Sequence, residues 1–167
     1  MDIKTKKIIV MTESSKFKNN CVAGIDLKTG NWVRIVSNDV GIHGALTNED
    51  LTYEDGNMCK VMDVVSVPYI DYVPTAVQTE NILLNREYYI EKDREASLDE
   101  VLEIHPDELH NYIFGTRYSS VKEEYLEELG IDYFLMLIKV SNLTFTRKQN
   151  NYGTIKLKLT FSYNGIE

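Results

Sequence analysis

Residues 21–37 read Cys21-Val22-Ala23-Gly24-Ile25-Asp26-Leu27-Lys28-Thr29-Gly30-Asn31-Trp32-Val33-Arg34-Ile35-Val36-Ser37. Side chains alternate in character on both sides of the Gly-containing segment 28–31, which is typical of two β-strands joined by a short hairpin loop. In the second strand, a period of two places Trp32, Arg34 and Val36 on one face. The stretch therefore predicts a β-hairpin that carries an aromatic ring beside a guanidinium.

More β-structure is expected on both sides of this hairpin. We predict one strand before the hairpin, over residues 7–11, and another after it, over residues 61–70. A long surface connection over 38–60 is expected between the hairpin and the later strand. Two further strands are predicted over 131–145 and 154–163. In residues 154–163, apolar and polar side chains alternate almost perfectly.

Helices are expected only within residues 97–130. Ser97 precedes Glu100 with capping-box spacing, Ser120 precedes Glu123 in the same way, and Gly130 is placed as a C-terminal cap. A short helix is also expected to follow Pro106, which suits a first helical turn.

Two clusters of short strands around a helical insert indicate a mainly β, α+β protein made of two small barrels rather than a parallel sheet. We expect the first barrel over residues 1–75 and the second over 76–167, with the helical insert at about 97–130.

The composition is that of a soluble globular chain: 167 residues, of which 43% are hydrophobic and 26% charged. No apolar run is long enough to span a bilayer, and the N-terminus lacks a secretory signal, so a cytoplasmic protein without a membrane partner is expected. Cys21 and Cys59 stand far apart and the three histidines are scattered, so we expect no disulfide, metal or cofactor.

A net charge of −8 argues against extended contact with nucleic acid, since phosphates are held by Lys and Arg. The charge is unevenly distributed, however. Residues 1–37 hold seven basic and three acidic side chains, and residues 131–167 hold five and two. A positive surface formed by these two segments is compatible with the overall charge.

The first candidate site lies just before the hairpin. Ser14, Lys16 and Lys18 offer hydroxyl and ammonium groups of the kind that contact phosphates from exposed loops. The alternative is a polar, solvated turn.

The second candidate site is the pair Trp32 and Arg34. An aromatic ring can stack on a base, and a neighbouring Arg can stack or contact phosphate. The alternative is that Trp32 is a core residue and that Arg34 forms an internal ion pair with Glu80 or Asp63.

The third candidate site is a polar cluster of Gln78, Glu80 and Asn81 before an apolar strand. Amide side chains can read base edges, and a carboxylate can orient an arginine. The alternative is a strand start with turn-forming residues.

In this order, these segments resemble the dual OB-containing domain family of prokaryotic proteins. The resemblance rests on Ser14-Ser15-Lys16 with Cys21-Val22-Ala23-Gly24-Ile25-Asp26, on Trp32-Val33-Arg34-Ile35-Val36-Ser37, on Met62-Asp63-Val64-Val65, on Gln78-Thr79-Glu80-Asn81 and on Phe161-Ser162-Tyr163-Asn164-Gly165. It implies two oligonucleotide/oligosaccharide-binding (OB) barrels and nucleic-acid binding, in settings such as defence against foreign DNA or RNA. Members of the family run on with another strand, so we expect the second barrel to lack its last strand and to expose an edge that invites homodimers.

The function expected from the sequence is a non-enzymatic module that binds single-stranded nucleic acid or a nucleotide. Trp32 would stack, Lys16, Lys18 and Arg34 would hold phosphates, and the cluster of Gln78, Glu80 and Asn81 would meet base edges. Two alternatives stay open. One is an interaction domain whose acidic helical face, within residues 86–130, docks a basic protein; the other is an enzyme that acts on a phosphoester.

Overall fold

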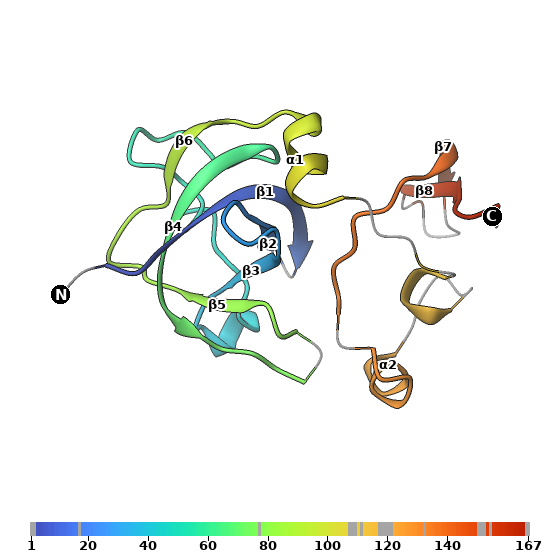
Figure 1. Ribbon diagram of the computed structural model, residues 1–167, viewed down its shortest axis with the longest axis horizontal. Helices are drawn as coiled ribbons and strands as arrows, with labels where there is room; N and C mark the ends of the chain where they lie inside the picture. The colour runs from blue at the N-terminus through green and yellow to red at the C-terminus, as the bar shows by residue number, and fades with distance from the viewer. Residues whose placement is uncertain are drawn as a thin grey trace. The chain divides into compact units, whose positions relative to one another are not determined.

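The computed structural model divides the chain into two units, Met1–Pro106 and Asp107–Glu167 (Figure 1). It describes residues 3–16, 18–76, 78–106, 110, 112–116, 122–131, 133–149, 153 and 155–165. Among the described residues, no helix is long and apolar enough to cross a membrane.

The first unit is built around a closed barrel of five strands. Its strands are β1 (Thr5–Lys16), β2 (Asn19–Asp26), β3 (Trp32–Val36), β4 (Asp63–Tyr72) and β5 (Asn81–Leu84), and a sixth, β6 (Glu91–Glu95), pairs with β4. They follow the order β1-β2-β3-β5-β4, and β4 pairs back onto β1 to close the circle. The β3–β5 pair is parallel and the others are antiparallel. The result is a five-stranded barrel of OB type.

The predicted hairpin is confirmed as β2 and β3, and its alternation fixes the inside of the barrel. Val33 and Ile35 are buried in the barrel core, whereas Trp32, Arg34 and Val36 are half-buried on the outer face. The predicted strands over 7–11 and 61–70 are confirmed as parts of β1 and β4.

The expectation of a surface connection over residues 38–60 is only partly right. The segment contains the short helix η1 (Val40–Ile42), but Leu46, Leu51, Tyr53 and Cys59 are buried members of the barrel core. These side chains are irregularly spaced, so no periodic pattern revealed that they complete the hydrophobic interior.

The predicted domain boundary at residue 75 differs from the division at Pro106. β5 pairs with β3 and β4, and β6 pairs with β4, so both strands belong to the first sheet. The helix α1 (Leu98–Ile104) also lies in this unit. The hydroxyl of Ser97 accepts a hydrogen bond from the N–H of Glu100 at 3.2 Å, so Ser97 caps α1 as predicted.

The second unit contains η2 (Ile113–Gly115), α2 (Glu123–Glu128), β7 (Ser141–Gln149) and β8 (Ile155–Ser162). Gly130, at φ +67°, follows α2, and the N–H of Ile131 donates to the carbonyl of Leu126, which confirms the predicted glycine cap. Ser120 and most of the helix expected after Pro106 lie outside the described residues.

One expectation for the second unit needs correction. The strand predicted over 131–145 begins only at Ser141, and the described residues before it are outside any strand and mostly half-buried. The helices expected over 97–130 are divided between the two units, with α1 in the first and α2 in the second. The described strands of this unit form one two-stranded sheet, β7–β8.

Candidate functional site

Four strands of the barrel place one residue each in a row across the outer face. Thr12 on β1 pairs with Ala23 on β2, Ala23 with Arg34 on β3, and Arg34 with Asn81 on β5. Neighbouring strands lie about 4.8 Å apart, so two candidate residues from distant segments become direct neighbours. We refer to Thr12, Ala23, Arg34 and Asn81 as the Arg34 row.

Glu80 holds the guanidinium of Arg34 in a fixed orientation. The Nε of Arg34 donates to Oε1 of Glu80 at 3.0 Å, and the two side chains are only 16% and 9% exposed. The backbone N–H of Arg34 also donates to the carbonyl of Glu80 at 3.0 Å. Among the described residues, no group hydrogen-bonds the two terminal nitrogens of Arg34, so this edge of the fork can receive an anion or an acceptor.

The internal ion pair considered from the sequence therefore forms with Glu80 and not with Asp63. Asp63 instead accepts hydrogen bonds from the hydroxyl of Tyr53 and from Lys92, both at 2.7 Å.

Asn81 brings a buried amide beside Arg34. Asn81 is 4% exposed, and its Nδ2 donates a long hydrogen bond of 3.4 Å to Oε1 of Gln78. Its Oδ1 is buried and has no hydrogen-bond partner among the described residues. Because a buried acceptor without a donor is costly, a donor from a bound molecule or water would stabilise this position.

Trp32 lies on the same face, two residues before Arg34, and is half-buried. Its ring meets the ring of His105 edge-on, with centroids 5.3 Å apart, and Nδ1 of His105 is 2.6 Å from the carbonyl oxygen of Gly30. Trp32 is thus neither fully buried nor an isolated platform. His105 is the C-cap of α1, a capping position that sequence spacing could not connect with Trp32.

The residues of the β1–β2 turn do not join this group. Ser14 pairs with Cys21 and shares the outer face, and Lys18 lies in the turn with φ +67°. The backbone of Lys16 pairs with Asn19, six residues along β2 from the partner of Trp32. Six residues of strand span about 20 Å, so Lys16 and Trp32 mark opposite ends of the face.

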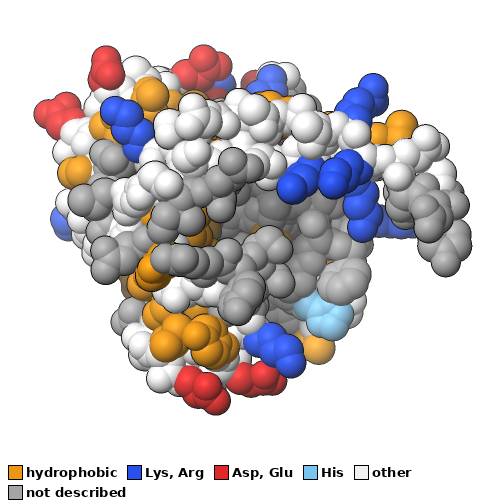
Figure 2. All heavy atoms as spheres, turned by 90° about the vertical axis from the view of Figure 1, so that its right-hand side faces the viewer, with side chains coloured by type: hydrophobic (Ala, Val, Ile, Leu, Met, Phe, Trp, Pro, Cys, Tyr) orange, Lys and Arg blue, Asp and Glu red, His pale blue; other side chains and the backbone are white. Residues whose placement is uncertain are grey.

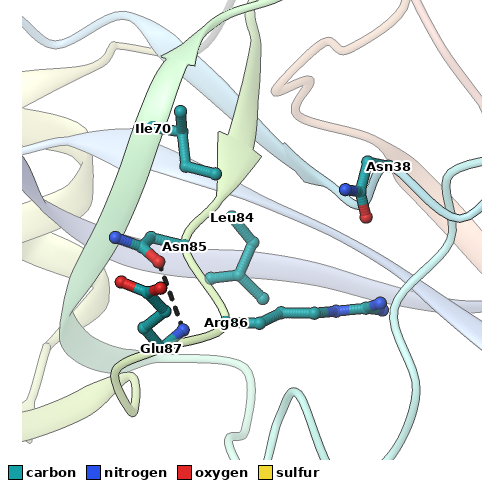
Figure 3. A pocket seen from close by; sticks show the side chains of 6 residues that line it. All are labelled: Asn38, Ile70, Leu84, Asn85, Arg86 and Glu87. Atoms are coloured by element: carbon teal, nitrogen blue, oxygen red, sulfur yellow. Dashed lines mark hydrogen bonds between the residues drawn. The ribbon is translucent and has the colours of Figure 1, made fainter.

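A pocket of about 400 Å³ lies elsewhere on the barrel and contains none of the candidate residues (Figure 3). Arg86 extends along it towards Asn38, with Leu84 and Ile70 forming an apolar wall. Asp50 accepts from Arg86 at 2.7 Å, so the one cation that lines this pocket is already neutralised.

Burial makes Cys59 and Asp63 structural groups. Burial raises the pKa of Cys59 to about 11, which keeps it a thiol rather than a nucleophilic thiolate at neutral pH. Burial alone would raise the pKa of Asp63, but hydrogen bonds from Lys92 and Tyr53 hold it below its ordinary value of 3.8.

Comparisons with known proteins bear on the same barrel. Neither curated proteins nor solved structures give a significant match. The family model of the dual OB-containing domain matches residues 6–167. Because this match spans nearly the whole chain and the first unit is a closed five-stranded barrel of OB type, the chain belongs to the dual OB-containing domain family.

Proposed function

We propose that this protein is a non-enzymatic module that binds single-stranded nucleic acid, or a nucleotide-type ligand, on the outer face of its first barrel. OB barrels bind oligonucleotides on the face of their second and third strands, with the loops at either end flanking the ligand. In this chain that face holds Trp32 and Arg34, and the flanking β4–β5 loop holds Gln78 and Glu80.

The observation that carries the proposal is the pair of neighbours in the Arg34 row. The terminal nitrogens of Arg34 suit a phosphate or the acceptor edge of a base. The buried Oδ1 of Asn81 has no donor among the described residues, and base amino and imino groups are donors. One nucleotide can supply both partners at once.

The charge of the site favours a short ligand. Glu80 neutralises Arg34, so the row attracts a long phosphate backbone only weakly. We expect affinity for a short strand to fall only slightly with rising salt. Ser14 and Lys18, at the far end of the face, would contact a strand only if it extends along β2.

The test uses the intrinsic fluorescence of Trp32, the single tryptophan of the chain. Wild-type protein and the variant Arg34→Lys are titrated with oligo(dT) and oligo(rA) of about 4 nucleotides. Arg34→Lys keeps the positive charge but removes the forked guanidinium group, and we expect it to weaken binding about 10-fold. Arg86→Lys is the matched control, because Arg86 is also paired with a carboxylate but lies outside the row.

Equal affinity in wild-type protein and Arg34→Lys would contradict the site, as would an equal loss in Arg86→Lys. A steep salt dependence with the short strands would contradict the nucleotide-sized footprint.

The alternative of an acidic docking face within residues 86–130 stays a prediction. α1 has seven residues, and its Glu100 is engaged by Arg94 at 2.5 Å. Asp99 and Glu103 remain on this helix, and α2 adds the exposed Glu124 and Glu128.

A further inference from the structure

The β7–β8 hairpin of the second unit has two faces of different composition. Lys148 pairs directly with Lys156, and Thr146 pairs with Lys158, so the three lysines share one face, which we call the lysine face. The next positions along each strand point the other way and are mostly apolar: Phe145 pairs with Leu159, whereas Leu157 pairs with Arg147 and Ile155 with Gln149.

The side chains of the lysine face are exposed and are not neutralised by the described part of the chain. Lys148, Lys156 and Lys158 are all exposed, and none forms an ion pair with a described residue. The first unit differs, because many of its basic side chains are paired with carboxylates. These are Lys4, Lys6, Lys7, Arg34, Arg86, Lys92 and Arg94.

A bound anion would relieve the repulsion within this arrangement. Like charges directly opposite each other on neighbouring strands destabilise a sheet, and Lys148 and Lys156 are such a pair. In a chain of net charge −8, carboxylates that could relieve this repulsion are plentiful, yet none of the described ones is placed here. In Figure 2, several Lys and Arg side chains lie close together toward the right of the view, and others are scattered over the same face.

We propose that the lysine face binds the phosphates of single-stranded nucleic acid, as a contact surface separate from the Arg34 row; this rests on the function proposed above. Lys156 and Lys158 stand two residues apart on one strand, about 6.7 Å, a spacing close to that of successive phosphates along an extended strand. Each ammonium is a point charge suited to a phosphate, and the hydroxyl of Thr146, directly opposite Lys158, adds a donor.

The same face does not suit a membrane. Proteins that lie on bilayers insert apolar side chains next to their basic ones. The lysine face presents only Lys and Thr side chains, including the directly paired Thr144 and Thr160, and the apolar residues of the hairpin point away from it. A molecule that covers the apolar face leaves the lysines in solvent.

The experiment measures fluorescence anisotropy of labelled oligo(dT) of about 16 nucleotides, with the full-length protein, between about 50 and 200 mM salt. The variant Lys148→Gln, Lys156→Gln, Lys158→Gln is compared with Lys28→Gln, Lys60→Gln, Lys122→Gln, which removes the same charge at exposed lysines elsewhere. Three lost phosphate contacts reduce the slope of log affinity against log salt by about 2. We expect this reduction in the first variant only, with unchanged binding of the short strands that report on Trp32.

An unchanged slope in the first variant overturns the proposal, and so does an equal reduction in the control. Loss of binding to vesicles containing phosphatidylserine, with an unchanged oligonucleotide slope, would assign the face to a membrane and also overturn it. The two proposals fail separately: Arg34→Lys weakens short-strand binding without changing the salt slope of the long strand, and the lysine variant changes that slope without changing short-strand binding.

Discussion

At the scale of single residues, the first unit relies on a few charged groups that are fixed by their partners. Arg34 and Glu80 come from segments 46 positions apart and are mostly buried together. Asp63 is 2% exposed and receives hydrogen bonds from Tyr53, Lys92 and the backbone of Lys60. Buried charges with good partners are costly to break singly, because the remaining charge stays behind without compensation.

Glu80→Gln removes the carboxylate that orients Arg34. We expect the free energy of unfolding to fall by about 1–3 kcal/mol, as for other hydrogen bonds to charged groups. Urea denaturation monitored by circular dichroism measures this change. Glu87→Gln, an exposed carboxylate outside the row, should stay within about 0.5 kcal/mol of wild type, and an equal stability of the two variants would contradict the role of Glu80.

Asp63 should make the protein sensitive to acid. Its pKa lies below the ordinary 3.8 in the folded state, so its contribution to stability is complete above about pH 4 and is lost as the pH falls through the folded value. We therefore expect the melting temperature of wild type to fall more steeply below pH 4 than that of Asp63→Asn, which is less stable at neutral pH. Parallel curves for the two proteins would show that Asp63 does not titrate in this way.

At the scale of elements, the β1–β2 pair is shaped by close backbone contact. β1 has a register shift between Val10 and Thr12, and Gly24 on β2 faces this irregularity. A Cβ atom at Gly24 would lie 2.2 Å from the carbonyl oxygen of Ile9, far inside contact distance. The two strands can approach this closely because Gly24 has no side chain.

Gly24→Ala should therefore separate β1 from β2. We expect a loss of about 1–3 kcal/mol or more in the free energy of unfolding, as in other overpacked sites. Gly41→Ala is the control, since a Cβ there lies 3.2 Å from the flexible side chain of Asp39. Thermal melts of both variants measure the difference, and a Gly24→Ala protein as stable as Gly41→Ala would argue against the tight approach.

At the scale of the whole molecule, the chain consists of two units, and the barrel is closed within the first. All the candidate residues named from the sequence fall in this unit, whereas the lysine face belongs to the second. Homodimer formation through a strand edge stays a prediction, which light scattering can check.

A fragment of residues 1–106 should fold without the second unit, because every strand of the barrel lies within it. We expect a single cooperative thermal transition and a dispersed amide NMR spectrum. A fragment without a cooperative transition would show that the barrel needs residues 107–167.

The parts of the fold that follow from local pattern were predictable. The alternation through Val33, Arg34 and Ile35 identified the hairpin and its faces, and Glu80 was one of two partners considered for Arg34. The domain boundary was not predictable, because the parallel pairing of Arg34 with Asn81 joins distant segments and leaves no periodic trace. His105 was missed as the neighbour of Trp32 for the same reason.

The closure of the barrel by β1 and β4 also has a kinetic consequence. Thr5 pairs with Pro68 and Ile9 with Val64, so these contacts form only after the intervening chain has been brought around. Contacts at such sequence separation slow folding, whereas the neighbouring β1–β2 and β2–β3 pairs can form early. Until closure, the edges of β1 and β4 stay open to other chains, so aggregation should compete most strongly with folding in newly made protein.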